Sequence, residues 1–169
     1  MSPLPHLLYV PPSFLNHLPS LRLGYGYYTI GPCGEELLSA VALALRSTDS
    51  VALHYRHVGL SIARQLLTGT EVSSIALNRA RATCCSIYDP ITAGRHCAIG
   101  GGDFDFYVTS TLASQTPPAV GRAFGFGLAS QQLKKSAHFP PDSVSFVSVG
   151  DGSTHNAHFL AAVKKDPTH

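Results

Sequence analysis

The stretch VSFVSVGDGSTHNAHFLAAV, residues 144–163, holds a valine-rich run, then Gly-Asp-Gly, then a mainly apolar segment. The apolar run over 144–149 predicts a buried, central and parallel strand. The segment 154–164 predicts a helix, so that Asp151 stands where a strand meets a helix. Helices and strands that alternate along a chain are typical of α/β proteins, and this is the fold class that we expect.

The chemistry of the Gly-Asp-Gly turn follows from its place beyond a strand. Ligands of open α/β sheets bind beyond the carboxyl ends of the strands, and the start of a helix attracts phosphate. Gly150 and Gly152 would let a backbone approach such a ligand closely. A carboxylate at this position repels phosphate unless a cation lies between them, and Mg²⁺ binds carboxylate and phosphate oxygens together. Asp151 is therefore a candidate magnesium ligand, and the alternative is a helix N-cap within a turn.

The first half of the chain predicts an arm and then several elements of an α/β domain. Residues 1–30, rich in Pro, Leu and Tyr, predict an N-terminal arm. GEELLSAVALALR (34–46) predicts a buried helix, because its apolar residues cover more than one face. VALHYR (51–56) predicts a short strand that ends in a polar cluster. Two further helices are predicted over 57–69, closed by a glycine, and over 71–84.

The second half begins with a different pattern. Residues 86–110 contain Asp-Pro and three consecutive glycines, and they predict a long loop. A helix is predicted to begin near Pro117–Pro118, because proline suits a first turn. Gly121, Gly125 and Gly127 fall on this helix and predict tight packing against another backbone, since glycine otherwise weakens a helix.

Composition limits the classes of function. Charged residues make up 13% of the chain and hydrophobic residues 44%, which is typical of a chain that also covers surface against a partner protein. A net charge of +2, from scattered Lys and Arg, argues against nucleic acid as a partner. The apolar runs are too short to span a membrane, and the proline-broken start is a poor signal peptide. The four cysteines show no zinc spacing, and we expect reduced thiols in a soluble intracellular protein.

Two other segments carry polar chemistry. Tyr55 and Arg56 end the strand predicted over 51–56, just before a predicted helix, and the planar guanidinium of Arg56 matches a phosphate group. A surface ion pair is the alternative for Arg56. The segment TSTLASQ (109–115) offers hydroxyl and carbonyl oxygens that can bind a monovalent cation or hydrogen-bond a ligand. Its alternative is a capped helix start.

Several of these motifs, in this order, resemble one family. They are GPCGEE (31–36), TDSVALHYRHVGL (48–60), DPITAGRH (89–96), TSTLASQTPPAVGRAFG (109–125) and SVGDGS (148–153). The set is similar to the α-subunit, or α-half, of the thiamine-diphosphate-dependent decarboxylase component of 2-oxo acid dehydrogenase complexes. The likeness covers about residues 25–163.

The resemblance implies a fold, a reaction and partners. Residues 31–169 would form the first half of a thiamine-diphosphate-binding domain, with a mostly parallel sheet flanked by helices. The cofactors would be thiamine diphosphate and magnesium, with potassium in some members. The reaction would be oxidative decarboxylation of a 2-oxo acid, a branched-chain acid being favoured over pyruvate, with acyl transfer to a lipoyl group. A β-subunit or β-half and a lipoyl-bearing acyltransferase would be the partners, and neither nucleic acid nor membrane would be one.

The family's site residues map onto this chain by motif. Tyr55 and Arg56 match the pair that holds the cofactor diphosphate. The positions that match cofactor contacts or the magnesium motif, with Asp151 as the metal ligand, are Ser110, Leu112, Gly150, Asp151, Gly152 and Ser153. The positions that match a potassium-binding segment are Thr109, Ser114 and Gln115, although Thr111 replaces a proline and Ser114 a threonine there. His96 matches a loop histidine near the active site, and a hydrogen bond within its own loop is the alternative.

The sequence departs from the family after Val163. The family's magnesium motif needs an asparagine roughly 25–30 residues beyond Gly-Asp-Gly, and the sequence given ends at His169. The downstream catalytic histidine is missing as well, so we expect a C-terminally shortened relative. One alternative is a non-catalytic fragment that only pairs with a related subunit. Another is an unrelated hydrolase or binding module, although neither a GxSxG elbow nor a P-loop is present. The compartment would be the cytoplasm in a bacterium and the mitochondrial matrix in a eukaryote.

Overall fold

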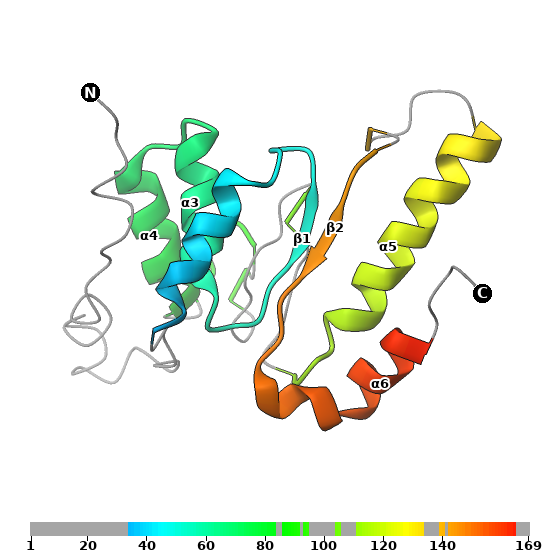
Figure 1. Ribbon diagram of the computed structural model, residues 1–169. Helices are drawn as coiled ribbons and strands as arrows, with labels where there is room; N and C mark the ends of the chain where they lie inside the picture. Colours follow the sequence, from blue (N-terminus) through cyan, green and yellow to red (C-terminus); the bar gives the residue numbers. More distant parts are fainter. Residues whose placement is uncertain are drawn as a thin grey trace.

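The computed structural model describes residues 34–83, 86–91, 93–94, 104–105, 111–133, 139–140 and 142–164. The elements are η2 (Glu35–Leu43), β1 (Ser50–Ala52), α3 (Val58–Leu67), α4 (Val72–Thr83), α5 (Thr116–Leu128), η3 (Ala129–Leu133), β2 (Ser145–Val147), η4 (Asp151–His155) and α6 (Ala157–Lys164) (Figure 1). Both η2 and η4 are 3₁₀ helices, whereas η3 is a π-helical turn. The arm predicted over residues 1–30 lies outside the described residues.

The two strands β1 and β2 form a parallel sheet, so the α/β class is confirmed. Val51 of β1 lies opposite Phe146 of β2. On its other side, Val51 forms a parallel bridge with Asp105, and its N–H donates to the carbonyl of Phe104 at 2.8 Å. In the described part of the chain, β1 is therefore the central strand.

This arrangement corrects the prediction that 144–149 would be a buried central strand. All three residues of β1 are buried, whereas those of β2 are half-buried. The parallel direction of β2 is confirmed. The position of β1 was missed because its second neighbour, Asp105, comes from the glycine-rich segment that was predicted to be loop.

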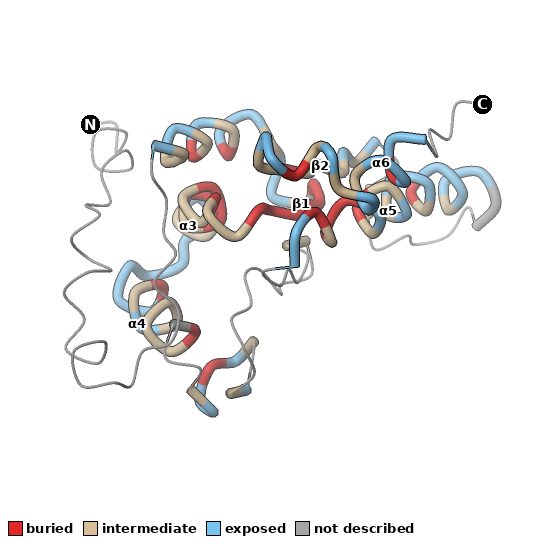
Figure 2. Tube along the Cα trace, turned by 90° about the horizontal axis from the view of Figure 1, so that it is seen from below, coloured by how far each residue is buried: buried red, intermediate tan, exposed pale blue. Residues whose placement is uncertain are grey.

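Helices lie on both sides of the strand pair. Figure 1 shows η2, α3 and α4 on one side and α5 and α6 on the other. Helix α5 packs against both strands and α6 packs on α5, while α3 contacts η2 and α4. The core cluster consists of Ala42, Val51, Leu53, Leu60 and Ala63. Burial is concentrated along β1 and the start of α3 (Figure 2).

The helix boundaries follow local sequence signals. Helix α5 begins with two prolines in its first turn, as predicted. Helix α3 is followed by Gly69 at φ +86°, a left-handed conformation that glycine adopts easily. The helix predicted over 154–164 begins later, because Asn156 is extended. Asn156 instead caps α6, its Oδ1 accepting the N–H of His158 at 2.8 Å.

Two packing predictions are wrong. The segment over 34–46 is not a buried helix but the 3₁₀ helix η2, in which Leu37 and Leu43 are 76% and 56% exposed. Its buried residues are Ser39 and Ala42, because neighbouring elements cover only one side of it. The glycines of α5 do not mark a tight contact either: a Cβ placed on Gly121, Gly125 or Gly127 would meet no described atom within 4 Å. None of the described helices has the length and apolar character that crossing a bilayer requires.

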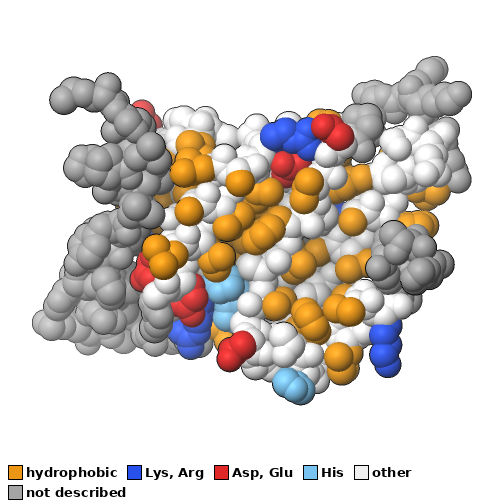
Figure 3. All heavy atoms as spheres, viewed as in Figure 1, with side chains coloured by type: hydrophobic (Ala, Val, Ile, Leu, Met, Phe, Trp, Pro, Cys, Tyr) orange, Lys and Arg blue, Asp and Glu red, His pale blue; other side chains and the backbone are white. Residues whose placement is uncertain are grey.

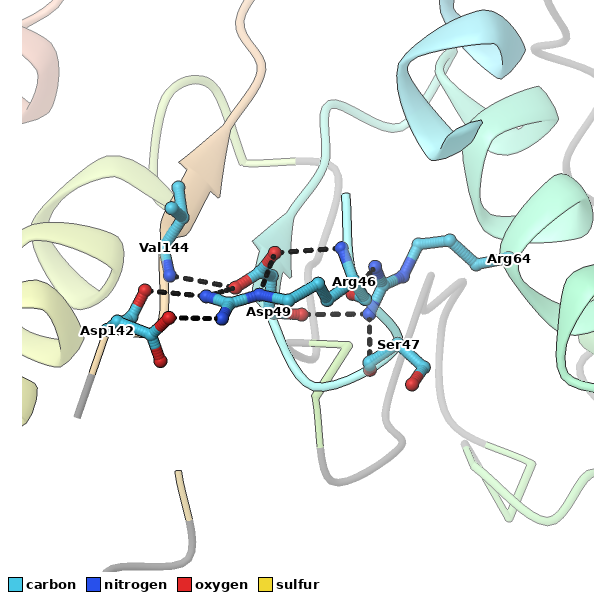
Figure 4. A network of polar contacts seen from close by, with 6 residues as sticks. All are labelled: Arg46, Ser47, Asp49, Arg64, Asp142 and Val144. Carbon is cyan, nitrogen blue, oxygen red and sulfur yellow. Dashed lines mark hydrogen bonds and ion pairs between the residues drawn. The ribbon is translucent and has the colours of Figure 1, made fainter. Parts of the chain in front are cut away.

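Arg64 of α3 organises the amino edge of the strands (Figure 4). Its buried guanidinium donates to the carbonyls of Arg46, Ser47 and Asp49 at 3.0, 3.0 and 2.8 Å. Its Nε also donates to Asp105 Oδ1 at 3.1 Å. Burial raises the pKa of Asp105, and the charge of Arg64 and its hydrogen bond offset part of that rise. One cation thus fixes the turn before β1 and the residue that pairs with β1.

Asp49 fixes the turn from the other side. Its carboxylate accepts the Arg46 N–H at 2.8 Å, the Arg46 guanidinium at 2.9 Å and the Val144 N–H at 2.9 Å (Figure 4). Burial opposes ionisation of Asp49, but these donors outweigh it, so the pKa of Asp49 is lowered from 3.8. The guanidinium of Arg46 also contacts the exposed Asp142 at 2.6 Å. These contacts align the start of β2 with the start of β1.

Candidate functional site at the carboxyl edge of the strands

Two of the predicted motifs, Tyr55–Arg56 and Gly150–Asp151, lie beyond the carboxyl ends of β1 and β2, at the same edge of the sheet. The strands are parallel, and pairing extends one residue beyond them, because the Ser148 N–H donates to the Ala52 carbonyl at 3.1 Å. Beyond that point the chain reaches Tyr55–Arg56 on one side and Gly150–Asp151 on the other. The two segments touch: His54 Nε2 lies 3.4 Å from the position that a Cβ of Gly150 would occupy.

Ser148 joins three segments at this edge. Its hydroxyl oxygen accepts the backbone N–H of His54 at 3.0 Å and lies 2.8 Å from Nδ1 of His57. Its carbonyl accepts the side-chain amide of Gln115 at 2.8 Å. All four of these residues are buried. The end of β1, the start of α3 and the segment ahead of α5 are thus held against the end of β2.

His54 and His57 are neutral bases at this edge. Each is 6% exposed, and their ring centroids lie 5.0 Å apart. Burial lowers the pKa of His54, and the nearby His57 and Arg56 lower it further, whereas Glu35 acts in the opposite direction. Burial also lowers the pKa of His57, again against the effect of Glu35. Both imidazoles are therefore uncharged near pH 7.

Tyr55 and Arg56 are half-buried and lie next to these histidines. The Tyr55 ring lies 3.9 Å from that of His54, centroid to centroid. The guanidinium carbon of Arg56 lies 5.7 Å from the centroid of the Tyr55 ring. The backbone N–H of Arg56 donates to Nδ1 of His54 at 3.2 Å. The Tyr-Arg pair is thus placed at the carboxyl edge, as its position after a strand predicts.

Asp151 is exposed in the first turn of η4. The N-cap of η4 is Gly150, with no side-chain cap hydrogen bond, so the alternative role of Asp151 as an N-cap is not adopted. Within the described residues, no hydrogen bond or ion pair engages the Asp151 carboxylate. The backbone carbonyl of Asp151 accepts a hydrogen bond from the hydroxyl of Thr154 at 2.7 Å. Ser153 is buried, and its backbone N–H donates to the carbonyl of Gly150. No described atom lies within 4 Å of a Cβ placed on Gly152, so the turn is open there.

The segment ahead of α5 reaches the same edge through Gln115. Leu112 is 41% exposed. The hydroxyl of Ser114 donates to the carbonyl of Thr111 at 2.9 Å, and the side-chain amide of Gln115 donates to the carbonyl of Ser148. The Gln115 side chain thus fixes the segment to β2. The other predicted site residues, His96, Thr109 and Ser110, lie outside the described residues.

The metal-binding capacity of the described residues is narrow. They contain no group of three or more His, Cys, Asp or Glu side chains that could hold a metal ion, so Asp151 is a single carboxylate. A Mg²⁺ ion commonly takes one or two carboxylates, with phosphate and water completing its shell. Asp151 alone could supply one carboxylate of such a shell, and a bound ligand would have to supply the phosphates. No protein-family model and no curated protein matches the chain.

Sequence reasoning missed the polar cluster of His54, His57 and Ser148. A signal was present, because two histidines three residues apart flank Tyr55–Arg56, and a serine precedes Gly-Asp-Gly. Polar side chains at strand ends are common, however, and their burial depends on contacts between segments that are 91 to 94 residues apart.

Proposed function

We propose that this chain is the α-type part of a thiamine-diphosphate- and magnesium-dependent enzyme that decarboxylates a 2-oxo acid oxidatively. A branched-chain acid is the favoured substrate, with pyruvate second, and the acyl group passes to a lipoyl group on an acyltransferase. A β-type chain completes the enzyme. The observation that supports this proposal best is that Tyr55–Arg56 and Gly150–Asp151–Gly152 follow two paired parallel strands at one edge, where His54, the residue before Tyr55, lies against Gly150.

The residues at this edge suit a diphosphate with its metal. Arg56 supplies a cation for phosphate oxygens, and the exposed carboxylate of Asp151 supplies a ligand for Mg²⁺. The open turn at Gly152 leaves room for both groups. Leu112, exposed on a segment fixed to the same edge, offers apolar contact to the cofactor. When bound, thiamine diphosphate supplies a nucleophilic carbon and an electron sink. In this proposal the chain's own residues bind and orient it.

A second candidate function is non-catalytic pairing with a related subunit. It is favoured by the number of large apolar side chains that are exposed. They include Leu37, Leu43, Val72, Ile87, Tyr88, Phe124, Leu160 and Val163. Figure 3 shows apolar side chains spread over one face of the described chain, with few charged ones among them. Both candidates bury such a surface against a partner, but only the first requires cofactor binding.

A pair of matched variants tests the proposed function. Asp151 follows β2, and Asp142 precedes it at the opposite edge, so Asp151→Asn and Asp142→Asn remove the same charge from the two ends of one strand. Isothermal titration of the full chain, with any partner that co-purifies, would measure thiamine diphosphate binding in the presence of Mg²⁺. We expect Asp151→Asn to abolish binding and Asp142→Asn to leave it unchanged. Binding that survives in Asp151→Asn would refute the role of Asp151.

A further inference from the structure

His54 carries a hydrogen-bond donor that the described protein leaves unused. The residue as a whole is buried, at 6% exposed. Its Nε2 lies 3.4 Å from the Cβ position of Gly150, beside the Gly-Asp-Gly turn. Among the described residues, none forms a hydrogen bond with this nitrogen. Nε2 of His54 is not one of the fully buried side-chain atoms that lack a partner within the described part of the chain. This nitrogen is therefore an accessible donor on an otherwise buried ring, and a ligand at the turn could accept its hydrogen bond.

The other ring nitrogen decides which atom carries the proton. Nδ1 of His54 accepts the backbone N–H of Arg56 at 3.2 Å, so in the neutral ring it bears no hydrogen. The proton of the neutral imidazole is then on Nε2, which makes Nε2 a donor. The burial that lowers the pKa of His54 keeps the ring in this neutral form near pH 7.

The surroundings of Nε2 suit an acceptor with negative charge. Arg56 lies two residues along the chain, and its backbone is fixed by the same imidazole. His57 is neutral, and the Ser148 hydroxyl is already engaged by His57 and by the His54 N–H. Asp151 is the acidic residue of the Gly-Asp-Gly turn itself. A metal ion bound to its carboxylate would also bind an anion at this turn.

We propose that His54 is a further ligand-binding residue, whose Nε2–H donates to an oxygen of a diphosphate group held at Gly150–Gly152. This inference rests on the proposed function and adds a contact to it. Arg56 would supply charge, Asp151 the metal contact, and His54 a directional hydrogen bond. The Arg56 N–H fixes the ring so that one donor faces the turn.

Two amide substitutions separate the two nitrogens of His54. His54→Asn keeps an acceptor near the place of Nδ1 for the Arg56 N–H but loses the distant donor. His54→Gln keeps a donor near the place of Nε2 and loses the near acceptor. The probes are thiamine diphosphate with Mg²⁺ and inorganic pyrophosphate with Mg²⁺, titrated into the full chain. Far-UV circular dichroism and urea midpoints would verify that both variants are folded.

We expect His54→Asn to weaken binding of both probes by about tenfold or more, as the loss of a hydrogen bond to a charged group does. His54→Gln should stay within about threefold of the unchanged chain. The reverse order, with His54→Gln the weaker binder, would assign His54 a structural role in holding Arg56 and would overturn the proposal. Equal affinities in all three proteins would overturn it too.

The two probes distinguish a failure of this inference from a failure of the proposed function. Binding of thiamine diphosphate that depends on Asp151 but not on His54 would overturn the role of His54 alone. Binding of pyrophosphate that depends on His54, without any binding of thiamine diphosphate, would support the donor and overturn the cofactor. Binding of neither probe by the unchanged chain would overturn both.

Discussion

The hydroxyl oxygen of Ser148 lies 2.8 Å from Nδ1 of His57, and the contact ties the end of β2 to the start of α3. The same oxygen accepts the backbone N–H of His54 at 3.0 Å. The relative position of the two candidate motifs therefore depends on one side chain that was not among the predicted site residues. This dependence leads to a stability prediction.

Ser148→Ala is expected to destabilise the fold by about 1–3 kcal/mol, because it leaves two buried groups without their partner. The matched control is Ser130→Ala, since the Ser130 hydroxyl makes an exposed bond to the Gly127 carbonyl. That change should stay within about 0.5 kcal/mol. Urea unfolding followed by circular dichroism would measure both. Equal losses in the two variants would contradict the central role of Ser148.

Arg64→Met is expected to cost about 3 kcal/mol, because it removes the buried partner of the half-buried Asp105 carboxylate. It also removes the donor to three backbone carbonyls ahead of β1. Arg81→Met is the control, as Arg81 is half-buried and its described partner is Asn78, at 3.4 Å. Urea midpoints of the two variants would be compared. A loss in Arg64→Met no larger than in Arg81→Met would argue against the network at the amino edge.

Asp49→Ala and Asp142→Ala should differ strongly, although both residues pair with Arg46. Asp49 is buried and also accepts the Val144 N–H, so its loss should cost about 2–3 kcal/mol. Asp142 is exposed, and an exposed ion pair adds little. Thermal unfolding of the two proteins side by side would reveal the order, which similar melting temperatures would contradict.

The pH dependence of stability follows from the two buried histidines. Their folded-state pKa values lie below the usual 6.5, so the unfolded chain binds more protons as the pH falls through that range. Above about pH 6.5 both histidines are neutral in the folded and the unfolded chain, and they cost the fold no stability. As the pH falls toward their lowered folded-state pKa values, the unfolded chain takes up protons first, and the free energy of unfolding decreases. Urea midpoints between pH 7.5 and pH 5 are expected to fall.

The double variant His54→Gln, His57→Gln isolates this effect. Asp105, whose pKa burial raises, acts in the opposite direction and is present in both proteins. The double variant should show a flatter profile between pH 7.5 and pH 5 than the unchanged chain. Parallel profiles would mean that the histidines do not set the acid sensitivity.

Local patterns predicted the elements and the placing of the main motifs. The apolar run 144–149 predicted the parallel strand β2, and the paired prolines predicted the start of α5. The parallel pairing of β1 and β2 brings Tyr55–Arg56 and Gly150–Asp151 to one edge, where His54 Nε2 lies 3.4 Å from the Cβ position of Gly150. These features depend on residues close together in sequence, or on a general rule for parallel strands.

Features that depend on distant contacts were not predictable in this way. The exposure of Leu37 depends on which elements cover η2, and the central place of β1 depends on Asp105. The burial of Ser148 and His54 requires two segments 94 residues apart to meet. The sequence around a polar residue at the end of a strand does not indicate which distant segment will pack against it.

The proposed function requires the carboxyl edge of the strands to bind thiamine diphosphate through Mg²⁺. The most direct measurement is an equilibrium titration of the full chain, with any partner that co-purifies, in Mg²⁺ and again in EDTA. We expect saturable binding in Mg²⁺ and its loss in EDTA, because Asp151 would reach the diphosphate only through the metal. An absence of saturable binding in Mg²⁺, or equal binding in EDTA, would contradict it.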